Sequence, residues 1–249
     1  MLHASVHDLG SAVFWVAVLQ IIFINILVSG DNAVVIALAC RDLPPRQRLW
    51  GMVIGAGIAV MLRIVFAGLI ARLMLLPYLK LAGGLALIYI AVGLVVPEAA
   101  DKNKIQAVAH LWRAVRIVVV ADIVMSLDNV IAIAAVAHGQ LVLLAIGLVV
   151  SVPIIVAGSA LIMALLDRFP IFVWAGAALL GWVAGDTIAT DPAVVGHLTA
   201  AVGAEFARQV EFAAAGAGIL LVVALGGLWR QIHLTKVRAR PAGEHAGGS

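Results

Sequence analysis

Two short stretches place carboxylate and amide side chains inside long apolar runs. Residues 25–39 read NILVSGDNAVVIALA and residues 122–136 read DIVMSLDNVIAIAAV, so each carries an Asp-Asn pair, at 31–32 and at 128–129. A carboxylate at the centre of a bilayer costs about 2.5–3.5 kcal/mol. The two stretches therefore predict a partner that offsets this cost, such as a cation, a proton or a basic side chain inside the protein.

The polar side chains of both stretches present oxygen ligands. Carboxylate, amide, hydroxyl and carbonyl oxygens suit Mg²⁺, Ca²⁺ and Mn²⁺, whereas thiolates and imidazoles suit Cu(I) and Zn²⁺. The single cysteine, Cys40, cannot form a thiolate site alone, and His110, His138 and His197 fall in predicted loops rather than mid-span. The pattern favours a hard divalent cation. The candidate ligands are Asp31, Asn32, Asp122, Asp128 and Asn129, and the possible supporting residues are Asn25, Ser29, Ser126, Asp186 and Arg63.

Helical spacing limits which of these groups can meet. Asp122, Ser126 and Asn129 are at i, i+4 and i+7, so they share one helix face. Asp128, at i+6, points about 240° away from Asp122. Both aspartates can reach one site only if the helix unwinds near residues 126–128, which would also free backbone carbonyls. In the first stretch Gly30 weakens the helix, so a break is expected at the sequence SGDN.

The composition of the whole chain requires a membrane. Hydrophobic residues make up 64% of the chain and charged residues 12%, against about 45–50% and about 25% in soluble domains. The net charge of +3 does not indicate nucleic-acid binding, because the basic residues flank apolar spans. The first ten residues contain no Lys or Arg, so the first span is expected to stay as a membrane helix rather than a cleaved signal.

A helix needs about 20 apolar residues to cross a bilayer, and seven apolar segments of the chain are long enough. Twelve Lys and Arg residues fall on one side of the resulting topology and three on the other. The positive-inside rule then places the N-terminus outside and the C-terminus in the cytoplasm of an inner-membrane, multi-pass protein. The predicted spans are 13–39, 49–71, 76–96, 114–137, 141–166, 170–188 and 210–229.

The two polar stretches are copies of one motif, [N/D]-x3-S-x-D-N-x3-I-A, at an offset of 97 residues. Three spans separate the start of the first copy from the start of the second. Because three is an odd number of membrane crossings, the second copy has the opposite orientation in the membrane. We therefore predict one all-α membrane domain, residues 1–249, with inverted three-helix repeats at about 13–96 and 114–188. A seventh helix at about 210–229 and a disordered tail at about 238–249 complete it. In such folds the substrate site lies at the repeat interface near the midplane.

Two further charged residues lie within the predicted spans. Arg63 either extends its charge to the membrane surface or neutralises an aspartate while the site is empty. Asp186, in the stretch GWVAGDTI, is an interfacial residue, a gate or an additional ligand. The residues alone leave these alternatives open.

The paired Asp-Asn motifs resemble those of the TerC family of integral membrane proteins, in its YjbE-type branch, and the likeness covers almost the whole chain. The family belongs with LysE-like transporters and is linked to manganese export and, by name, to tellurium resistance. The resemblance implies that Asp31, Asn32, Asp122, Asp128 and Asn129 line a cation path and that Mn²⁺ is substrate rather than a permanently bound cofactor. Asn25 stands where an acidic residue is common in the family, which lowers the negative charge of the site by one.

Three other functions were weighed. A LysE-like exporter of amino acids or other small solutes would need an apolar or anion-binding pocket. A metal-sensing or scaffold protein would bind the ion without moving it. An intramembrane aspartyl protease usually shows YD and GxGD, and neither occurs here, so we expect no catalytic residues and no enzyme activity.

Overall fold

Helices make up almost all of the part of the chain that the computed structural model describes, namely residues 12–73, 76–96, 104–136, 141–202 and 204–238. These residues contain no β-strand. The helices are α1 (Ala12–Val28), α2 (Gly30–Cys40), α3 (Pro45–Leu73), α4 (Leu79–Val95), α5 (Lys104–Val136), α6 (Leu141–Arg168), α7 (Ile171–Ala189), α8 (Pro192–Val202) and α9 (Ala204–Arg238).

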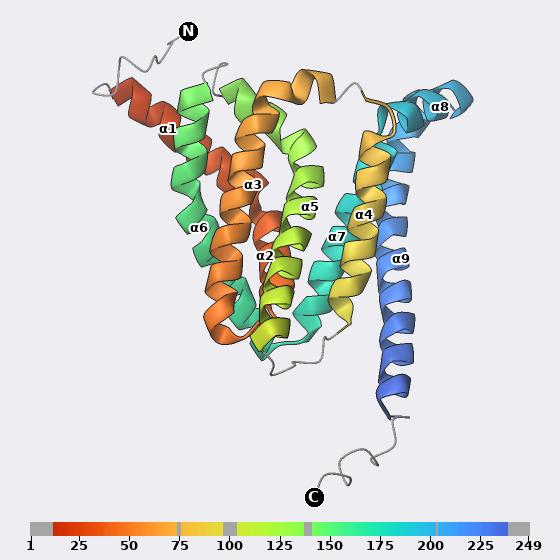
Figure 1. The fold of residues 1–249 in the computed structure, drawn as a ribbon. Helices are drawn as coiled ribbons and strands as arrows, with labels where there is room; N and C mark the ends of the chain where they lie inside the picture. Colours follow the sequence, from red (N-terminus) through yellow and green to blue (C-terminus); the bar gives the residue numbers. More distant parts are fainter. Residues whose placement is uncertain (1–11, 74–75, 97–103, 137–140, 203, 239–249) are drawn as a thin grey trace, which may run out of the picture.

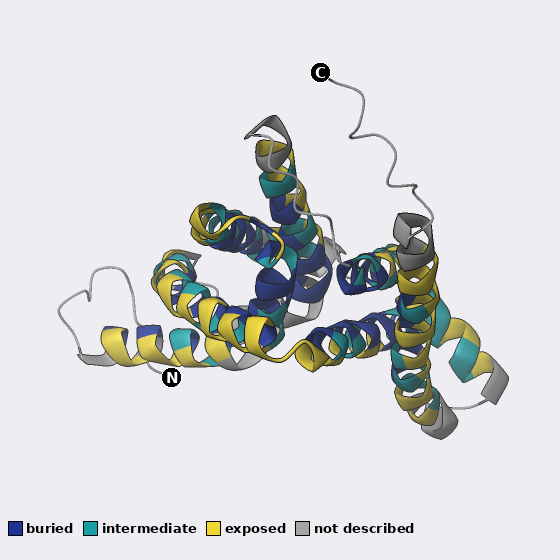
Figure 2. Ribbon diagram, turned by 90° about the horizontal axis from the view of Figure 1, so that it is seen from below, coloured by how far each residue is buried: buried dark blue, intermediate teal, exposed yellow. Residues whose placement is uncertain are grey.

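Most helices run along one common direction; α1 and α2 both descend in Figure 1, and from α2 to α7 successive helices alternate between down and up. Their apolar residues cover the outside of the bundle as well as its centre, and Figure 2 shows the buried positions facing inward with exposed positions outward. Leu161, Leu220 and Tyr89 are each more than 70% exposed. Helices that are hydrophobic on all sides belong in a protein core or a membrane. The exposed apolar surface therefore faces lipid.

Length and composition identify the helices that can cross a bilayer. Four described helices qualify on their own, namely α3, α6, α7 and α9. A fifth crossing results if α1 and α2, which meet at a 55° bend, count as one broken span. Among the shorter apolar helices is α4, with 17 residues. The molecule is thus a multi-pass helical protein.

Small residues allow the closest helix contacts in the molecule. Gly181 of α7 lies against the backbone of Gly218 on α9, where an added Cβ would come within 2.6 Å of the Gly218 carbonyl oxygen. Gly185, one turn later, lies against the Ala214 carbonyl in the same way. Membrane helices commonly approach closely through glycines at this four-residue spacing. The contact fixes α9 against α7, and α4 packs on both helices.

The helix boundaries correct several sequence predictions. The first predicted span is two helices, and the break lies at Ser29, within the predicted SGDN sequence. The fourth predicted span begins ten residues earlier than expected, at Lys104, so His110 lies on α5 and not in a loop. His197 lies on α8, a helix that the hydropathy pattern did not predict. His138 and the predicted disordered tail beyond Arg238 lie outside the described residues.

The break falls directly before the glycine that was expected to weaken the helix. Ser29 has a φ of −107° and a ψ of 12°, which leave the helical region. Gly30 itself begins α2, its φ is not in the left-handed region, and a Cβ there would meet no atom within 4 Å. No close contact therefore requires glycine at this position, and its low helix propensity is the property that the sequence prediction used. The Ser29 hydroxyl does not cap α2, because it is used elsewhere in the bundle.

Candidate functional site

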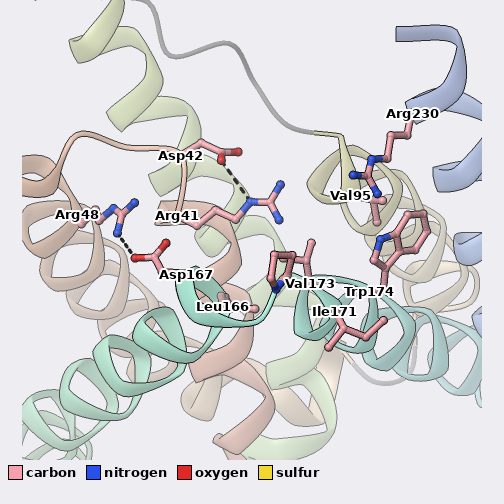
Figure 3. Close-up of a pocket in the computed structure, with 11 residues that line it drawn as sticks. Arg41, Asp42, Arg48, Val95, Leu166, Asp167, Ile171, Val173, Trp174 and Arg230 are labelled. Atoms are coloured by element: carbon pink, nitrogen blue, oxygen red, sulfur yellow. Dashed lines mark hydrogen bonds and ion pairs between the residues drawn. The ribbon is translucent and has the colours of Figure 1, made fainter. Parts of the chain in front are cut away.

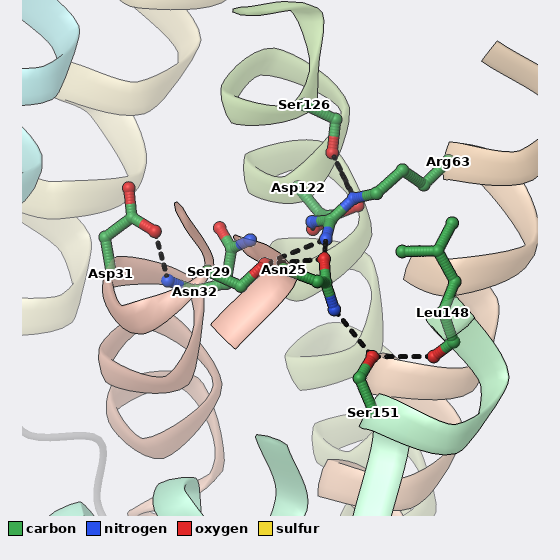
Figure 4. Close-up of polar contacts among 9 residues, drawn as sticks. All are labelled: Asn25, Ser29, Asp31, Asn32, Arg63, Asp122, Ser126, Leu148 and Ser151. Atoms are coloured by element: carbon green, nitrogen blue, oxygen red, sulfur yellow. Dashed lines mark hydrogen bonds and ion pairs between the residues drawn. The ribbon is translucent and has the colours of Figure 1, made fainter. Parts of the chain in front are cut away.

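The break between α1 and α2 is surrounded by three other helices. Ser29 alone separates the end of α1 at Val28 from the start of α2 at Gly30. Both α5 and α6 pack against both halves of the broken pair, and α3 packs against α2, α5 and α6. Polar side chains from these helices meet beside the break (Figure 4). The fold thus brings the two motif copies together inside the bundle.

Arg63 of α3 is the centre of this group, and its side chain is 2% exposed. Its Nη2 donates to Asp122 Oδ1 at 2.5 Å in a buried ion pair. Nη1 donates to Asn25 Oδ1 at 2.7 Å and to Ser29 Oγ at 2.9 Å, and Nε donates to Ser126 Oγ at 3.1 Å. We call these five residues the Arg63 cluster. Arg63 thus binds the first two polar positions of both motif copies.

The other members of the Arg63 cluster bond to one another and to α6. Ser126 Oγ donates to Asp122 Oδ2 at 3.0 Å, and Ser29 Oγ donates to Asn25 Oδ1 at 3.1 Å. The Asn25 amide nitrogen donates to Ser151 Oγ at 2.5 Å. Buried polar groups that find partners avoid the desolvation penalty of about 1–3 kcal/mol each. The cluster is therefore a neutral, bonded network in which Arg63 offsets the charge of Asp122.

The Asp-Asn pair at the start of α2 is bonded differently. Asn32 is 4% exposed, and within the described part of the chain neither its amide oxygen nor its amide nitrogen has a hydrogen-bond partner. Asp31 is only partly buried, and its Oδ1 accepts a hydrogen bond from the Asn32 backbone N–H at 2.8 Å. Buried polar groups without partners are rare in folded proteins and indicate a ligand, an ion or a water. Because the Asn32 amide has no described partner, we call Asp31 and Asn32 the open ligand pair.

The predicted ligands thus divide into separate groups. Asp31 and Asn32 are adjacent and open, whereas Asp122 is held in the Arg63 cluster. The side chains of Asp128 and Asn129 lie outside the described residues, although their backbone belongs to α5. Asp186 is exposed near the end of α7.

No three His, Cys, Asp or Glu side chains gather into a metal-binding group among the residues that the structure describes. A cation bound at this place would therefore depend on amide, hydroxyl or carbonyl oxygens in addition to carboxylates.

The second motif copy does not unwind. We expected an unwound segment near residues 126–128 if Asp122 and Asp128 were to share one site, but α5 is an uninterrupted helix from Lys104 to Val136. Residue 127 is Leu, a strong helix former, where the first copy has Gly30. The break therefore exists in only one of the two copies.

Sequence reasoning missed Ser151, which links Asn25 to α6 and is fully buried. A signal for it existed, because a hydroxyl inside an apolar span commonly forms a hydrogen bond between membrane helices. Without a motif around it, nothing in the sequence named its partner. Its own hydroxyl donates to the Leu148 carbonyl at 2.7 Å, which leaves its oxygen to accept from Asn25.

Two cavities open at the end of the bundle where α2 meets α3. The first has a volume of about 520 Å³, and in it Arg41 pairs with Asp42 and Arg48 pairs with Asp167 (Figure 3). Arg230 of α9 lies over the Trp174 ring at 5.8 Å from its centroid. The Arg48–Asp167 ion pair joins α3 to α6, and the Arg41–Asp42 pair lies within the turn after α2, so we assign the first cavity a structural role.

The second cavity has a volume of about 620 Å³ and lies between α2, α4, α5 and α9. Most of its wall is apolar, as at Leu38, Ile90 and Trp229. Its basic side chains are His110, Arg113 and Arg116, against one carboxylate, Asp42. Leu38 is seven residues beyond Asp31 on α2, about two helical turns. The α2 residues that line the cavity thus lie about two turns away from the open ligand pair.

Comparison with known proteins places the chain among membrane proteins. The family model described as the integral membrane protein TerC family matches residues 10–233. The uncharacterized membrane protein YjbE of Bacillus subtilis is 43% identical over 178 residues, which cover 72% of this chain and 81% of that protein. The uncharacterized membrane protein YceF of the same organism is 26% identical over 181 residues, or 69% and 70% of the two chains. No solved structure matches the chain.

Proposed function

Because the chain belongs to the TerC family of integral membrane proteins, we propose that it transports divalent metal cations across the bacterial inner membrane, with Mn²⁺ as the exported substrate. The observation that carries this proposal is the open pair of Asp31 and Asn32 at a broken membrane helix. Broken helices with exposed polar groups at mid-membrane are typical substrate sites of transporters. Carboxylate and amide oxygens are ligands that Mn²⁺ prefers over the ligand types of copper and zinc.

The proposed architecture has seven crossings, formed by the broken pair α1–α2 and by α3, α4, α5, α6, α7 and α9. It also has an inverted repeat, which maps α1–α2 onto α5, α3 onto α6 and α4 onto α7. The helix contacts agree with this mapping, because contacts made by helices of one half have counterparts in the other. The contact of α3 with α5 corresponds to that of α6 with α1 and α2. The contact of α4 with α5 corresponds to that of α7 with α2. In addition, α3 packs on its own counterpart α6, and α4 packs on its own counterpart α7.

Two glycine contacts give the mapping residue-level support. Gly55 of α3 lies against Val118 of α5, where an added Cβ would be 3.1 Å from Val118 Cγ1. Gly147 of α6 lies against Ile21 of α1 in an even closer contact. Ile21 and Val118 are separated by 97 residues, the offset of the polar motifs, and each glycine follows an isoleucine. The same glycine-to-β-branched contact thus occurs in both proposed halves.

The test of the transport proposal is Mn²⁺ flux into proteoliposomes that contain the purified protein. Asn32→Ala is the sharpest variant, because its side chain has no described hydrogen bond for the fold to lose. We expect flux to fall at least tenfold while the melting temperature stays the same or rises, since the substitution removes an unpaired buried amide. Asp31→Asn and Asp128→Asn should also abolish flux, and Asp167→Asn, a change at a surface ion pair, is the matched control.

Normal Mn²⁺ flux in both Asn32→Ala and Asp31→Asn would reject the open ligand pair as the substrate site. Binding of Mn²⁺ without any flux would instead favour a metal-sensing or scaffold protein.

The second cavity favours one other candidate, a LysE-like exporter of amino acids or other small solutes. Its apolar wall and basic rim suit an organic anion better than a metal ion, because like charges at a pore mouth lower the local concentration of cations. The same proteoliposomes, loaded with labelled amino acids instead of Mn²⁺, distinguish the two. Amino-acid flux that survives Asp31→Asn but falls in Arg116→Gln would favour this candidate.

A further inference from the structure

Arg63 occupies a position at which a cation would find four side-chain oxygens. Its guanidinium lies within 2.5–3.1 Å of one side-chain oxygen each from Asn25, Ser29, Asp122 and Ser126. Carboxylate, amide and hydroxyl oxygens of this kind also bind divalent cations, at about 2.0–2.6 Å. A guanidinium and a metal ion cannot both contact these four oxygens. The two must therefore exclude one another.

On the basis of the proposed transport function, we propose that Arg63 is a tethered cation that competes with the transported divalent cation for Asp122 and the three polar side chains around it. With the site empty, Arg63 neutralises Asp122, so this buried carboxylate is not left unpaired. A cation that first binds the open pair Asp31 and Asn32 then reaches Asp122 only as Arg63 leaves. Loading is an exchange of one cation for another.

The arrangement is costly for a device that only holds helices together. Arg at the centre of a membrane helix costs about 2.5–3.5 kcal/mol on insertion scales, and a buried ion pair often stabilises a protein no more than apolar residues of the same volume. Hydroxyl and amide pairs such as Ser151 with Asn25 join membrane helices without any charge. The open pair, two and three residues after Ser29, has polar groups that Arg63 does not contact. The charge in the Arg63 cluster therefore fits competition with a cation better than a helix tie.

The test is equilibrium binding of Mn²⁺ to the purified full-length protein in detergent, in a double-mutant cycle. Its variants are Arg63→Gln, Asp122→Asn and the double variant. We expect Arg63→Gln to bind Mn²⁺ at least tenfold more tightly than the wild type. In the Asp122→Asn background the same change should give no such gain, because the ligand for which Arg63 competes is absent. Arg230→Gln removes a guanidinium at the end of the bundle and should leave the affinity unchanged.

The cycle separates direct competition from simple loss of charge. If Arg63 acts only through its long-range field, Arg63→Gln will raise the Mn²⁺ affinity equally with and without Asp122, and the proposal is overturned. An unchanged or weaker affinity in folded Arg63→Gln also overturns it and makes Arg63 a helix tie.

A second variant covers the case in which Arg63→Gln does not fold, because it leaves Asp122 unpaired. Arg63→Lys keeps the charge but lacks the planar guanidinium that reaches four oxygens. It should also bind Mn²⁺ more tightly than the wild type, by a smaller factor, and again only when Asp122 is present. Equal affinity in Arg63→Lys and the wild type overturns the proposal. Failure of the proposed transport function has a different signature, namely that neither the wild type nor any variant binds Mn²⁺.

Discussion

Three buried or half-buried aspartates show three ways to keep a carboxylate in an apolar protein. Asp122 pairs with Arg63, and the pair is surrounded by hydroxyl and amide groups. Asp31 accepts the backbone N–H that follows it at the start of α2, where a helix N-terminus favours negative charge. Asp191, which is fully buried after α7, relies on backbone N–H groups alone. Only Asp31 has an unpaired buried neighbour, Asn32, which is why the site is proposed there.

Asp191 joins the beginnings of two helices. Its Oδ1 accepts the N–H groups of Tyr78 at 3.1 Å and Ala193 at 2.9 Å, and its Oδ2 accepts the N–H of Leu81 at 3.1 Å. Burial alone would raise the pKa of Asp191, but the backbone hydrogen bonds from Leu81, Ala193 and Tyr78 outweigh it and hold the pKa below its usual value of 3.8. The charged form is therefore the one that stabilises the fold.

We expect Asp191→Asn to lower the free energy of unfolding at neutral pH by about 1–2 kcal/mol, because hydrogen bonds to a charged group are stronger than those to an amide. A lowered pKa means that the carboxylate stabilises the fold above its usual pKa and loses this effect as the pH falls through the lowered value. The gap between wild type and variant should thus close below pH 3.8, as measured by melting temperatures in detergent at pH 7 and pH 3. Asp167→Asn serves as the exposed control, and an equal gap at both pH values would refute the prediction.

At the scale of elements, helix ends and small residues decide the arrangement. The Ser29 hydroxyl bonds to Asn25 and Arg63 instead of capping α2, so the chain bends where its polar side chain is drawn into the bundle. Ser126 of α5 makes the matching bonds, to Asp122 one turn earlier and from Arg63, yet α5 stays helical, with the strong helix former Leu127 where the first copy has Gly30. Glycines then let α7 and α9 meet backbone to backbone.

We expect Gly185→Ala to destabilise the protein by about 1–3 kcal/mol, because the new Cβ would collide with the Ala214 carbonyl of α9 and force the helices apart. Gly216→Ala is the matched control on α9, since a Cβ there meets no atom within 4 Å. It should be neutral or stabilise by about 0.5–1 kcal/mol, as alanine favours a helix over glycine. Thermal unfolding in detergent measures both. Equal melting temperatures for the two variants would show that the close contact is not needed.

At the scale of the whole molecule, charge and helix direction together suggest an orientation. α1 begins at one end of the bundle and α9 finishes at the other (Figure 1). The basic residues of the loop between α2 and α3 and of α9 lie toward the second end, where both cavities open. On the positive-inside rule we predict that this end is cytoplasmic. α8 then lies at the outer surface.

Labelling with a membrane-impermeant maleimide tests this orientation in intact cells. The single native cysteine, Cys40, is fully buried and can be replaced by Ala to give a cysteine-free background. Gly196→Cys on α8, where a side chain has open space, should react from outside. Arg46→Cys, on the exposed start of α3, should react only after the membrane is permeabilised. The reverse pattern would place the cavities outside and overturn the predicted orientation.

The sequence by itself determined the membrane class, the helical fold, the break at SGDN and the residues of the two motif copies. These features follow from local amino-acid composition and from the helical periodicity of the apolar segments. The sequence also showed that Asp122 and Ser126 share a helix face. It could not decide whether Arg63 points to the surface or to an aspartate, since both positions fit the same helical pattern.

Only the tertiary structure decided how the polar groups pair. Arg63 and Asp122 are 59 residues apart, and Asn25 and Ser151 are 126 residues apart, so their bonds depend on which helices pack together. Periodicity gives the face of a helix but not its neighbour. The same packing left Asn32 buried without a partner among the described residues, and α5 stays helical through residues 126–128. In a bilayer every helix is apolar on its outside, so contacts between helices, and not hydropathy, select the pairing.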